Sequence, residues 1–188
     1  MSLLPMLSVV EIVAERVLLR KARDADRARL VELRTDAEVA AYIGGPRLRE
    51  DIERYLDAIG GAANATDAPG TFVIADKATD ELIGTFEIKC RAPDQPGRVI
   101  EGGEELELGY LMRRDAWGAG LASEAATAVL RAAADELPDQ PVLVVTQTAN
   151  QRSLRLAVRL GFRTVSTFEQ FDAEQTLLAA ALHSFTVG

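Results

Sequence analysis

The segment from Glu105 to Ala126 constrains the fold more than any other part of the chain. Its first residues alternate between apolar and polar, which predicts a strand that ends at Met112. A turn containing Gly118 and Gly120 then leads into a helix-forming sequence. Glycine accepts a positive φ, so backbone N–H groups in such a turn can converge on an anion beside the positive end of the helix. The segment therefore predicts a phosphate-binding turn inside an α/β fold.

Length and composition limit the possible organisation. The chain has 188 residues and 48% hydrophobic residues, which fits one buried core, so we expect a single domain over residues 1–188. No apolar run approaches the roughly 20 residues that span a bilayer, and we expect a soluble, cytoplasmic protein. One cysteine, Cys90, and one histidine, His183, predict neither a disulfide nor a metal site. The Met-Ser-Leu start is either native or added for expression.

The charge balance bears on the choice of partner. A formal net charge of −8 disfavours nonspecific binding to DNA or RNA, because their phosphates repel an acidic surface. A cationic acceptor fits this surface better. Surplus acidic residues are also an ordinary route to solubility, so both interpretations stay open. We expect no nucleic acid and no membrane as partner.

Periodicity and chain breakers predict the remaining elements. The other predicted strands are 18–20, 72–75, 82–88, 142–145, 162–171 and 175–185. The predicted helices are one from an Asp24 N-cap to about Arg34, one around Ile52 to Ile59, one from Leu121 to near Pro138, and one from Asn150 to Gly161. Residues 60–70 and 91–103 are predicted to be loops. The phosphate-binding turn thus lies in a β-α-β unit.

Taken alone, Gly118-x-Gly120-x-x-Ser123 is compatible with a dinucleotide-binding turn. That site needs an acidic residue about 20 positions further on, at the end of the next strand. Here the strand 142–145 leads to Thr146 instead. The Gly-x-x-x-x-Gly-Lys-Ser/Thr sequence of nucleotide triphosphatases is missing as well. Hydride transfer and nucleotide hydrolysis are therefore disfavoured.

Two blocks of the sequence are more specific than the turn alone. The first joins Glu107-x-Gly109-Tyr110 to the residues 117–125, and the second joins Asn150-x-x-Ser153 to Gly161-Phe162. With the order of the predicted elements, they resemble the GNAT acyltransferase superfamily, and its RimJ/RimL-type N-acetyltransferases in particular. The resemblance covers nearly the whole chain. It implies a mixed, mainly antiparallel, splayed sheet flanked by helices, with acetyl-CoA as cosubstrate between two strands that part at Met112.

The resemblance also implies the cofactor contacts. Leu111 and Met112 would pair with the pantetheine amides, because strands that separate leave backbone groups in need of partners. Asn150 would hydrogen-bond the pantetheine arm, and Trp117 would pack beside the turn. The pyrophosphate would be held by Gly118, Ala119, Gly120, Leu121 and Ala122.

Acetyl transfer to an amine requires a base, because amines with pKa values of about 8 to 10.4 are mostly protonated at neutral pH. Glu107 matches the position of a glutamate proposed as base in RimJ/RimL-like enzymes. It could equally be an ordinary polar residue on the less buried face of its strand, in register with Glu105. Glu87, on a neighbouring strand, is the reserve candidate for the base.

The departing thiolate needs a proton or a hydrogen bond. Many GNAT enzymes use a tyrosine seven residues beyond the asparagine, but Ala157 stands at that position. Ser153 is the donor that the resemblance implies instead, although a serine in the first turn of a helix can simply bond to backbone. A covalent route through Cys90 is disfavoured because no histidine accompanies it.

Several points stay open. Asp115 stands where the superfamily often has Gln or Arg, and a carboxylate cannot donate to a phosphate. Arg113, Arg114 or Arg152 could neutralise the cofactor phosphates. The acceptor could be a protein N-terminus or a small-molecule amine, and exposed C-terminal strands could pair two subunits. A non-catalytic CoA-binding regulatory module is the alternative function.

Overall fold

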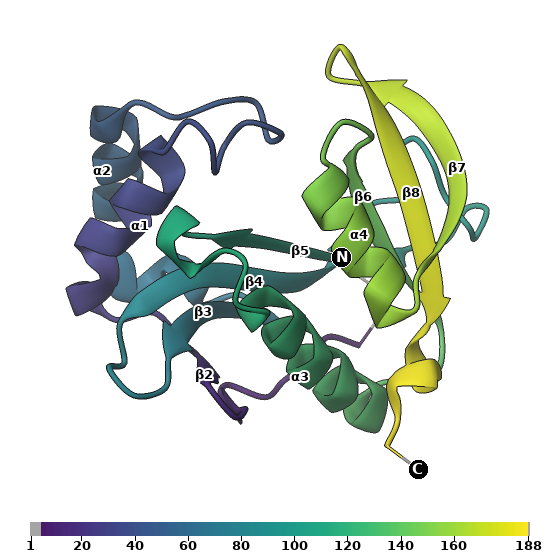
Figure 1. Cartoon of the computed structure of the whole chain (residues 1–188), viewed down its shortest axis with the longest axis horizontal. Coiled ribbons are helices and arrows are strands. Elements are labelled where there is room, and N and C mark those ends of the chain that lie inside the picture. Colours follow the sequence, from purple (N-terminus) through teal and green to yellow (C-terminus); the bar gives the residue numbers. More distant parts are fainter. Residues whose placement is uncertain (1–4, 188) are drawn as a thin grey trace. The chain divides into compact units, whose positions relative to one another are not determined.

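The computed structural model describes residues 5–187, so the Met-Ser-Leu start lies outside the described residues. Eight strands hydrogen-bond in the order β1-β2-β3-β4-β5-β6-β8-β7 (Figure 1). The pairs β1–β2, β2–β3, β3–β4, β6–β8 and β7–β8 are antiparallel, and β5–β6 is parallel. The predicted mixed, mainly antiparallel sheet is therefore confirmed.

The described chain forms two compact units. The first unit comprises residues 8–87 and 110–128, and the second comprises residues 5–7, 88–109 and 129–187. Two strands, β4 (Leu82–Arg91) and β5 (Glu105–Met112), continue from one unit into the other.

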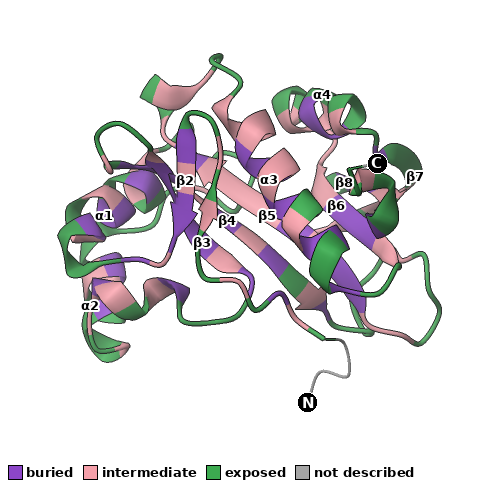
Figure 2. Cartoon of the chain, turned by 90° about the horizontal axis from the view of Figure 1, so that it is seen from below, coloured by how far each residue is buried: buried purple, intermediate pink, exposed green. Residues whose placement is uncertain are grey.

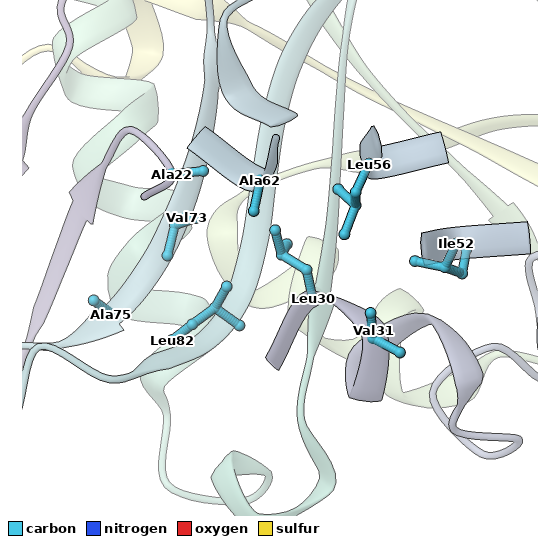
Figure 3. Packing of buried hydrophobic residues seen from close by; sticks show 9 residues of the cluster. All are labelled: Ala22, Leu30, Val31, Ile52, Leu56, Ala62, Val73, Ala75 and Leu82. Carbon is cyan, nitrogen blue, oxygen red and sulfur yellow. The ribbon is translucent and has the colours of Figure 1, made fainter. Parts of the chain in front are cut away.

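The first unit contains three complete strands and two helices. Its strands are β1 (Ile12–Val13), β2 (Val17–Arg20) and β3 (Thr71–Asp76), and its α-helices are α1 (Arg27–Thr35) and α2 (Arg49–Ala58). Three short 3₁₀ helices are η1 (Asp24–Asp26), η2 (Ala62–Thr66) and η3 (Arg114–Ala116). Side chains of α1, α2 and β3 pack together in one apolar cluster (Figure 3). Its members are Ala22, Leu30, Val31, Ile52, Leu56, Ala62, Val73, Ala75 and Leu82.

Two predictions for this unit are wrong in detail. Asp24 does not cap α1, which starts after Asp26; the Asp24 carboxylate accepts the Ala63 N–H instead, at 3.2 Å. The stretch 60–70 is not simply an exposed loop, because Ala62 and Thr66 are buried. The Thr66 hydroxyl accepts the Ala22 N–H at 2.7 Å, which attaches this segment to the chain just after β2.

The second unit holds the C-terminal half of the sheet. Its elements are β6 (Pro141–Gln147), α4 (Gln151–Leu160), β7 (Arg163–Gln170) and β8 (Ala173–Ala181). The helix α3 (Leu121–Glu136) begins in the first unit and ends in the second. The β-α-β connection predicted around the glycine turn is therefore present. Helix α4 buries Leu156 and Ala157 and exposes much of its remaining surface (Figure 2).

The last strand is shorter than predicted. β8 ends at Ala181, and residues 182–185 form the 3₁₀ helix η4 (Leu182–Phe185). His183 therefore lies after the strand, where its backbone N–H donates to Asp139 and its Nε2 lies 2.9 Å from the Leu137 carbonyl oxygen. These contacts give the histidine a structural role at the end of β8.

The parallel pairing of β5 with β6 is short. It comprises Leu106 with Val142 and Glu107 with Leu143, whereas β5 continues to Met112 and β6 to Gln147. The pairing thus ends five residues earlier than the predicted parting at Met112. Because backbone groups beyond the last pair need other partners, the end of β5 is suited to pair with an extended polar molecule.

Candidate functional site

The glycine turn before α3 has the predicted conformation. Gly118 and Gly120 have φ angles of 79° and 78°, in the left-handed region that glycine favours. A Cβ placed on Gly118 would meet nothing within 4 Å, so one side of the turn is open. Gly118, Ala119 and Gly120 are exposed, and α3 begins directly after them. An anion can therefore approach the turn and the positive end of a 16-residue helix.

Sequence reasoning missed two residues at this turn, Arg16 and Glu124. The Arg16 guanidinium donates from Nη1 to the Ala119 carbonyl oxygen at 2.8 Å and from Nε to Glu124 Oε2 at 2.8 Å. Glu124 Oε1 accepts the backbone N–H of Arg16 at 2.5 Å and that of Val17 at 3.3 Å. No local sequence signal could reveal this pair, because its members lie 108 positions apart.

Glu124 is held in its ionised form. Burial alone would raise the pKa of this carboxyl, but the hydrogen bonds from the Arg16 backbone, the Arg16 side chain and the Val17 backbone outweigh burial and lower the pKa below its ordinary value. The side chain of Glu124 is 16% exposed and that of Arg16 is 50% exposed. The pair thus joins the start of β2 to the first turn of α3.

The end of β5 is tightly built. The Trp117 indole N–H donates to the Met112 carbonyl oxygen at 2.9 Å, and the Arg113 N–H donates to the Ile83 carbonyl oxygen at 2.8 Å. A Cβ placed on Gly84 would lie 2.4 Å from the Leu111 carbonyl oxygen, so β4 approaches this end of β5 closely. Trp117 therefore fixes the backbone at one of the residues predicted to pair with pantetheine. A carbonyl oxygen can accept a second hydrogen bond.

Arg113 and Arg114, both candidates for binding the cofactor phosphates, form ion pairs. Arg113 contacts Asp115 at 2.9 Å and Glu81 at 3.2 Å. Arg114 contacts Asp36 at 2.7 Å. Burial opposes the ionisation of Asp36, but hydrogen bonds from backbone N–H groups and from Arg114 lower its pKa. Asp115, the departure noted in the turn sequence, is thus the partner of an arginine.

The predicted base, Glu107, forms an ion pair in the second unit. Arg91 Nε lies 2.9 Å from Glu107 Oε2, and the side chains are 4% and 21% exposed. The remaining Arg91 nitrogens donate to the carbonyl oxygens of Pro96 and Gly97. Arg91 is thus fixed by the loop after β4, and it fixes one oxygen of the Glu107 carboxylate in turn.

Glu105 was expected on the less buried face of β5, in register with Glu107. The structure contradicts this expectation. Only 1% of Glu105 is exposed. Its Oε1 accepts the N–H groups of Val99 and Ile100, both at 2.7 Å. The loop before β5 therefore covers the strand at Glu105, whereas Glu107, two residues later, is still accessible to solvent.

Asn150 and Ser153 lie together at the start of α4. Asn150 is the N-cap residue, and its side-chain oxygen accepts the Ser153 N–H at 3.3 Å. The Asn150 amide nitrogen donates to the Thr146 hydroxyl at 3.1 Å, at the end of β6. Ser153 is partly exposed in the first turn of the helix. Ala157, which replaces the common tyrosine, is 2% exposed.

The predicted residues thus form two groups. Leu111, Met112 and the residues 117–122 belong to the first unit, and Glu107, Asn150 and Ser153 belong to the second. Among residues 5–187, no group of three or more His, Cys, Asp or Glu side chains could hold a metal ion. Within the same range, no helix is both long and apolar enough to cross a bilayer.

Comparison with protein families gives one match across most of the chain. Residues 16–163 match the family model described as "Acetyltransferase (GNAT) domain". Among curated proteins, the chain is similar to the uncharacterized protein YkkB of Bacillus subtilis (strain 168). The two are 27% identical over 163 residues, which cover 86% of this chain and 90% of YkkB.

Solved structures show the same fold. A GNAT-family acetyltransferase from Bacillus anthracis superposes with a TM-score of 0.73 at 22% identity, over 92% of this chain and 99% of that one. The ribosomal L7/L12 alpha-N-protein acetyltransferase RimL, in complex with coenzyme A, superposes with a TM-score of 0.69 at 15% identity. That superposition covers 93% of this chain and 99% of RimL.

Proposed function

The chain belongs to the GNAT acetyltransferase family, and we propose that it transfers an acetyl group to a primary amine by direct attack, without an acyl-enzyme intermediate. GNAT enzymes use acetyl-CoA as the acetyl donor. The observation that carries the proposal is the open glycine turn at the start of α3, with positive φ at Gly118 and Gly120. Because the matched residues 16–163 run through both compact units, we also propose that the two units act as one acetyltransferase domain.

The chain has candidate hydrogen-bonding groups for both the diphosphate and the pantetheine arm of acetyl-CoA. Backbone N–H groups from Gly118 to Ala122 suit the diphosphate, and backbone groups of Leu111 and Met112 suit the amides of the pantetheine arm. Asn150 is a further candidate for that arm, since an amide can make more than the two hydrogen bonds it has. Bound acetyl-CoA supplies the thioester carbonyl that the amine attacks and the thiolate that leaves.

We assign the base to Glu107. Its carboxylate is partly exposed and oriented by Arg91, so it can take a proton from the acceptor ammonium, directly or through a water molecule, and leave the neutral amine to attack. Orientation supports this role, because a proton acceptor must lie within hydrogen-bond reach of the amine. Glu87, on β4, is the second candidate and lies in the first unit.

Ser153 is the proposed donor to the thiolate. Its place in the first turn of α4, beside the cap residue Asn150, puts a hydroxyl near the positive end of a helix. A hydroxyl there can stabilise a thiolate by hydrogen bonding while the proton itself comes from solvent. A thiol with a pKa near 8.5 leaves without a strong acid, which fits Ala157 in place of a tyrosine.

The acceptor is either a protein N-terminal amine or a small-molecule amine. RimL, whose structure is similar, is described as an alpha-N-protein acetyltransferase of ribosomal L7/L12. The net charge of −8 favours cationic acceptors of either kind.

A panel of acceptors tests the proposal. Peptides with a free α-amine, polyamines, amino acids and aminoglycosides are each incubated with acetyl-CoA, and the free thiol of released CoA is measured. CoA release that depends on an added amine supports an enzyme. Tight CoA binding with no amine-dependent release would instead make the chain a regulatory module.

The assignment of the base has its own test. Glu107→Gln should lower kcat about 10²- to 10⁴-fold and leave the affinity for acetyl-CoA unchanged, because the amide cannot accept the proton. The part of the pH dependence of kcat that arises from deprotonation of the base should also disappear. Glu169→Gln, on the exposed strand β7, changes the net charge equally and serves as the control. A Glu107→Gln variant with the wild-type pH profile would remove Glu107 from the role of base.

A further inference from the structure

The glycine turn that receives the diphosphate is intrinsically flexible. Gly118 and Gly120 can each adopt many backbone conformations, and a flexible loop must be ordered before it binds. In the structure, the peptide group between Ala119 and Gly120 is held from outside the turn. Arg16 Nη1 donates to the Ala119 carbonyl oxygen at 2.8 Å. The contact joins the turn to a residue in the N-terminal part of the chain.

This contact determines where an N–H group points. A trans peptide is planar, and its C=O and N–H bonds point in opposite directions. A guanidinium on the Ala119 carbonyl oxygen therefore directs the Gly120 N–H to the other side of the turn. The next peptide is fixed as well, because the Gly120 carbonyl oxygen accepts the Glu124 N–H at 3.1 Å. The turn thus presents its N–H groups in a fixed direction before an anion arrives.

Glu124 fixes the arginine. It accepts Arg16 Nε at 2.8 Å and the backbone N–H groups of Arg16 and Val17, and the Arg16 carbonyl oxygen accepts the Lys77 N–H at 2.9 Å. Arg16 Nη2 lies 3.6 Å from the position of a Cβ on Gly120, which is ordinary contact distance. We call this arrangement of Arg16, Glu124 and the Ala119 carbonyl the Arg16–Glu124 clamp.

We propose that the Arg16–Glu124 clamp is a positioning device that holds the turn in its diphosphate-binding conformation. The inference rests on the proposed binding of acetyl-CoA at residues 118–122. Neither residue is assigned a chemical step. The carboxylate of Glu124 neutralises the arginine, so the clamp acts through the direction of backbone N–H groups and not through added positive charge on the phosphates.

Two acetyl donors separate this role from a general structural one. Acetyl-CoA carries the diphosphate, and S-acetylpantetheine lacks it. Arg16→Met should raise the KM for acetyl-CoA and the Kd for CoA by about tenfold or more, the effect of losing one charge-assisted hydrogen bond. The kinetics with S-acetylpantetheine should stay close to wild type. Arg131→Met, on an exposed position of α3, removes the same charge and is the control.

Glu124→Gln decides between positioning and direct charge. Loss of a negative charge near the turn would strengthen phosphate binding if Arg16 were itself a phosphate ligand. The clamp predicts the opposite: the glutamine cannot accept from both backbone N–H groups and from Arg16 Nε, so the turn loosens and CoA binds more weakly. Arg16→Lys can reach only one of the two side-chain acceptors, Glu124 Oε2 or the Ala119 carbonyl oxygen, and should give an intermediate loss of CoA affinity. Circular dichroism and thermal unfolding show that each variant is folded.

The outcomes are distinct. Weaker CoA binding in both Arg16→Met and Glu124→Gln, with S-acetylpantetheine unaffected, supports the clamp. Tighter CoA binding by Glu124→Gln, unchanged binding in both variants, or an equal loss with both donors would overturn it. If the wild-type protein binds no CoA, the proposed function itself fails. If the wild type binds CoA and acetylates amines while both variants match it, only the clamp fails.

Discussion

Gly84→Ala should disturb the end of β5 that is proposed to pair with pantetheine. A Cβ on Gly84 would lie 2.4 Å from the Leu111 carbonyl oxygen and 2.7 Å from the Met112 sulfur. Ordinary contact begins at 3.4 Å, so β4 and β5 must separate here by about 1 Å. Overpacking of this kind costs about 1–3 kcal/mol. For a chain of this length, that corresponds to a fall of roughly 2–12 °C in Tm.

The functional effect should be larger than the effect on stability. Displacement of reacting groups by about 1 Å can lower a rate about 10²-fold. We therefore expect kcat/KM for acetyl-CoA to fall on the order of 10²-fold in Gly84→Ala. Steady-state kinetics over a range of acetyl-CoA concentrations measures this fall, and differential scanning calorimetry measures the Tm.

The sign of the change in Tm distinguishes a clash at Gly84 from free space at that position. Without a clash, alanine in a strand is more stable than glycine by about 0.5–1 kcal/mol. A Gly84→Ala variant with a raised Tm and an unchanged KM would therefore contradict the close approach of β4 and β5. Gly103→Ala is the control, because its nearest contact, at 3.0 Å, is a methyl group of the Ile100 side chain that can move. It should change stability by no more than about 0.5 kcal/mol.

Three further predictions concern single side chains. Asp26→Ala removes a partner of Arg20, which is 3% exposed, and should lower stability by about 3 kcal/mol in urea unfolding, since a buried charge loses its bidentate partner. Asn150→Ala should lower stability by about 1 kcal/mol and weaken CoA binding, whereas Asn150→Asp should keep the helix cap and weaken only CoA binding. Equal CoA affinity in the wild type and both variants would remove Asn150 from the cofactor site. The lowered pKa of Glu124 contributes stability above the ordinary carboxyl pKa of about 4.3, and this contribution is lost as the pH falls through the folded-state pKa. Thermal unfolding from pH 7 to pH 3 should therefore show a steeper loss for the wild type than for Glu124→Gln.

Elements with local signals were predictable from the sequence. The alternation in β5, the two glycines of the turn and the helical periodicity of α3 each arise from neighbouring residues. Asn150 and Gly161 bound α4 as predicted, with a side-chain cap at one end and a φ of 103° at the other. These residues act within one turn of the helix, so no tertiary information is needed.

Elements that depend on distant partners were not predictable. The segment 60–70 looks like a loop in sequence, but Thr66 accepts a hydrogen bond from Ala22, 44 positions away, and Ala62 joins the apolar cluster. The end of β8 was missed for a similar reason. The Leu182 N–H donates to the Gln140 carbonyl oxygen, which helps to turn the chain into η4 while the apolar pattern of the sequence continues.

Polar residues show why the site could be predicted only in part. Periodicity indicates the face on which a side chain lies, but the role of a charged group depends on its partner. Glu105 and Glu107 share a face of β5, yet the loop before β5 buries the first and Arg91 orients the second. The motif around Gly118 likewise supplies the turn, while its orientation depends on Arg16, a surface arginine whose acceptors lie more than 100 positions further along the chain. A resemblance carried by local motifs therefore points to the groups proposed to contact the cofactor more readily than to the groups that hold them in place.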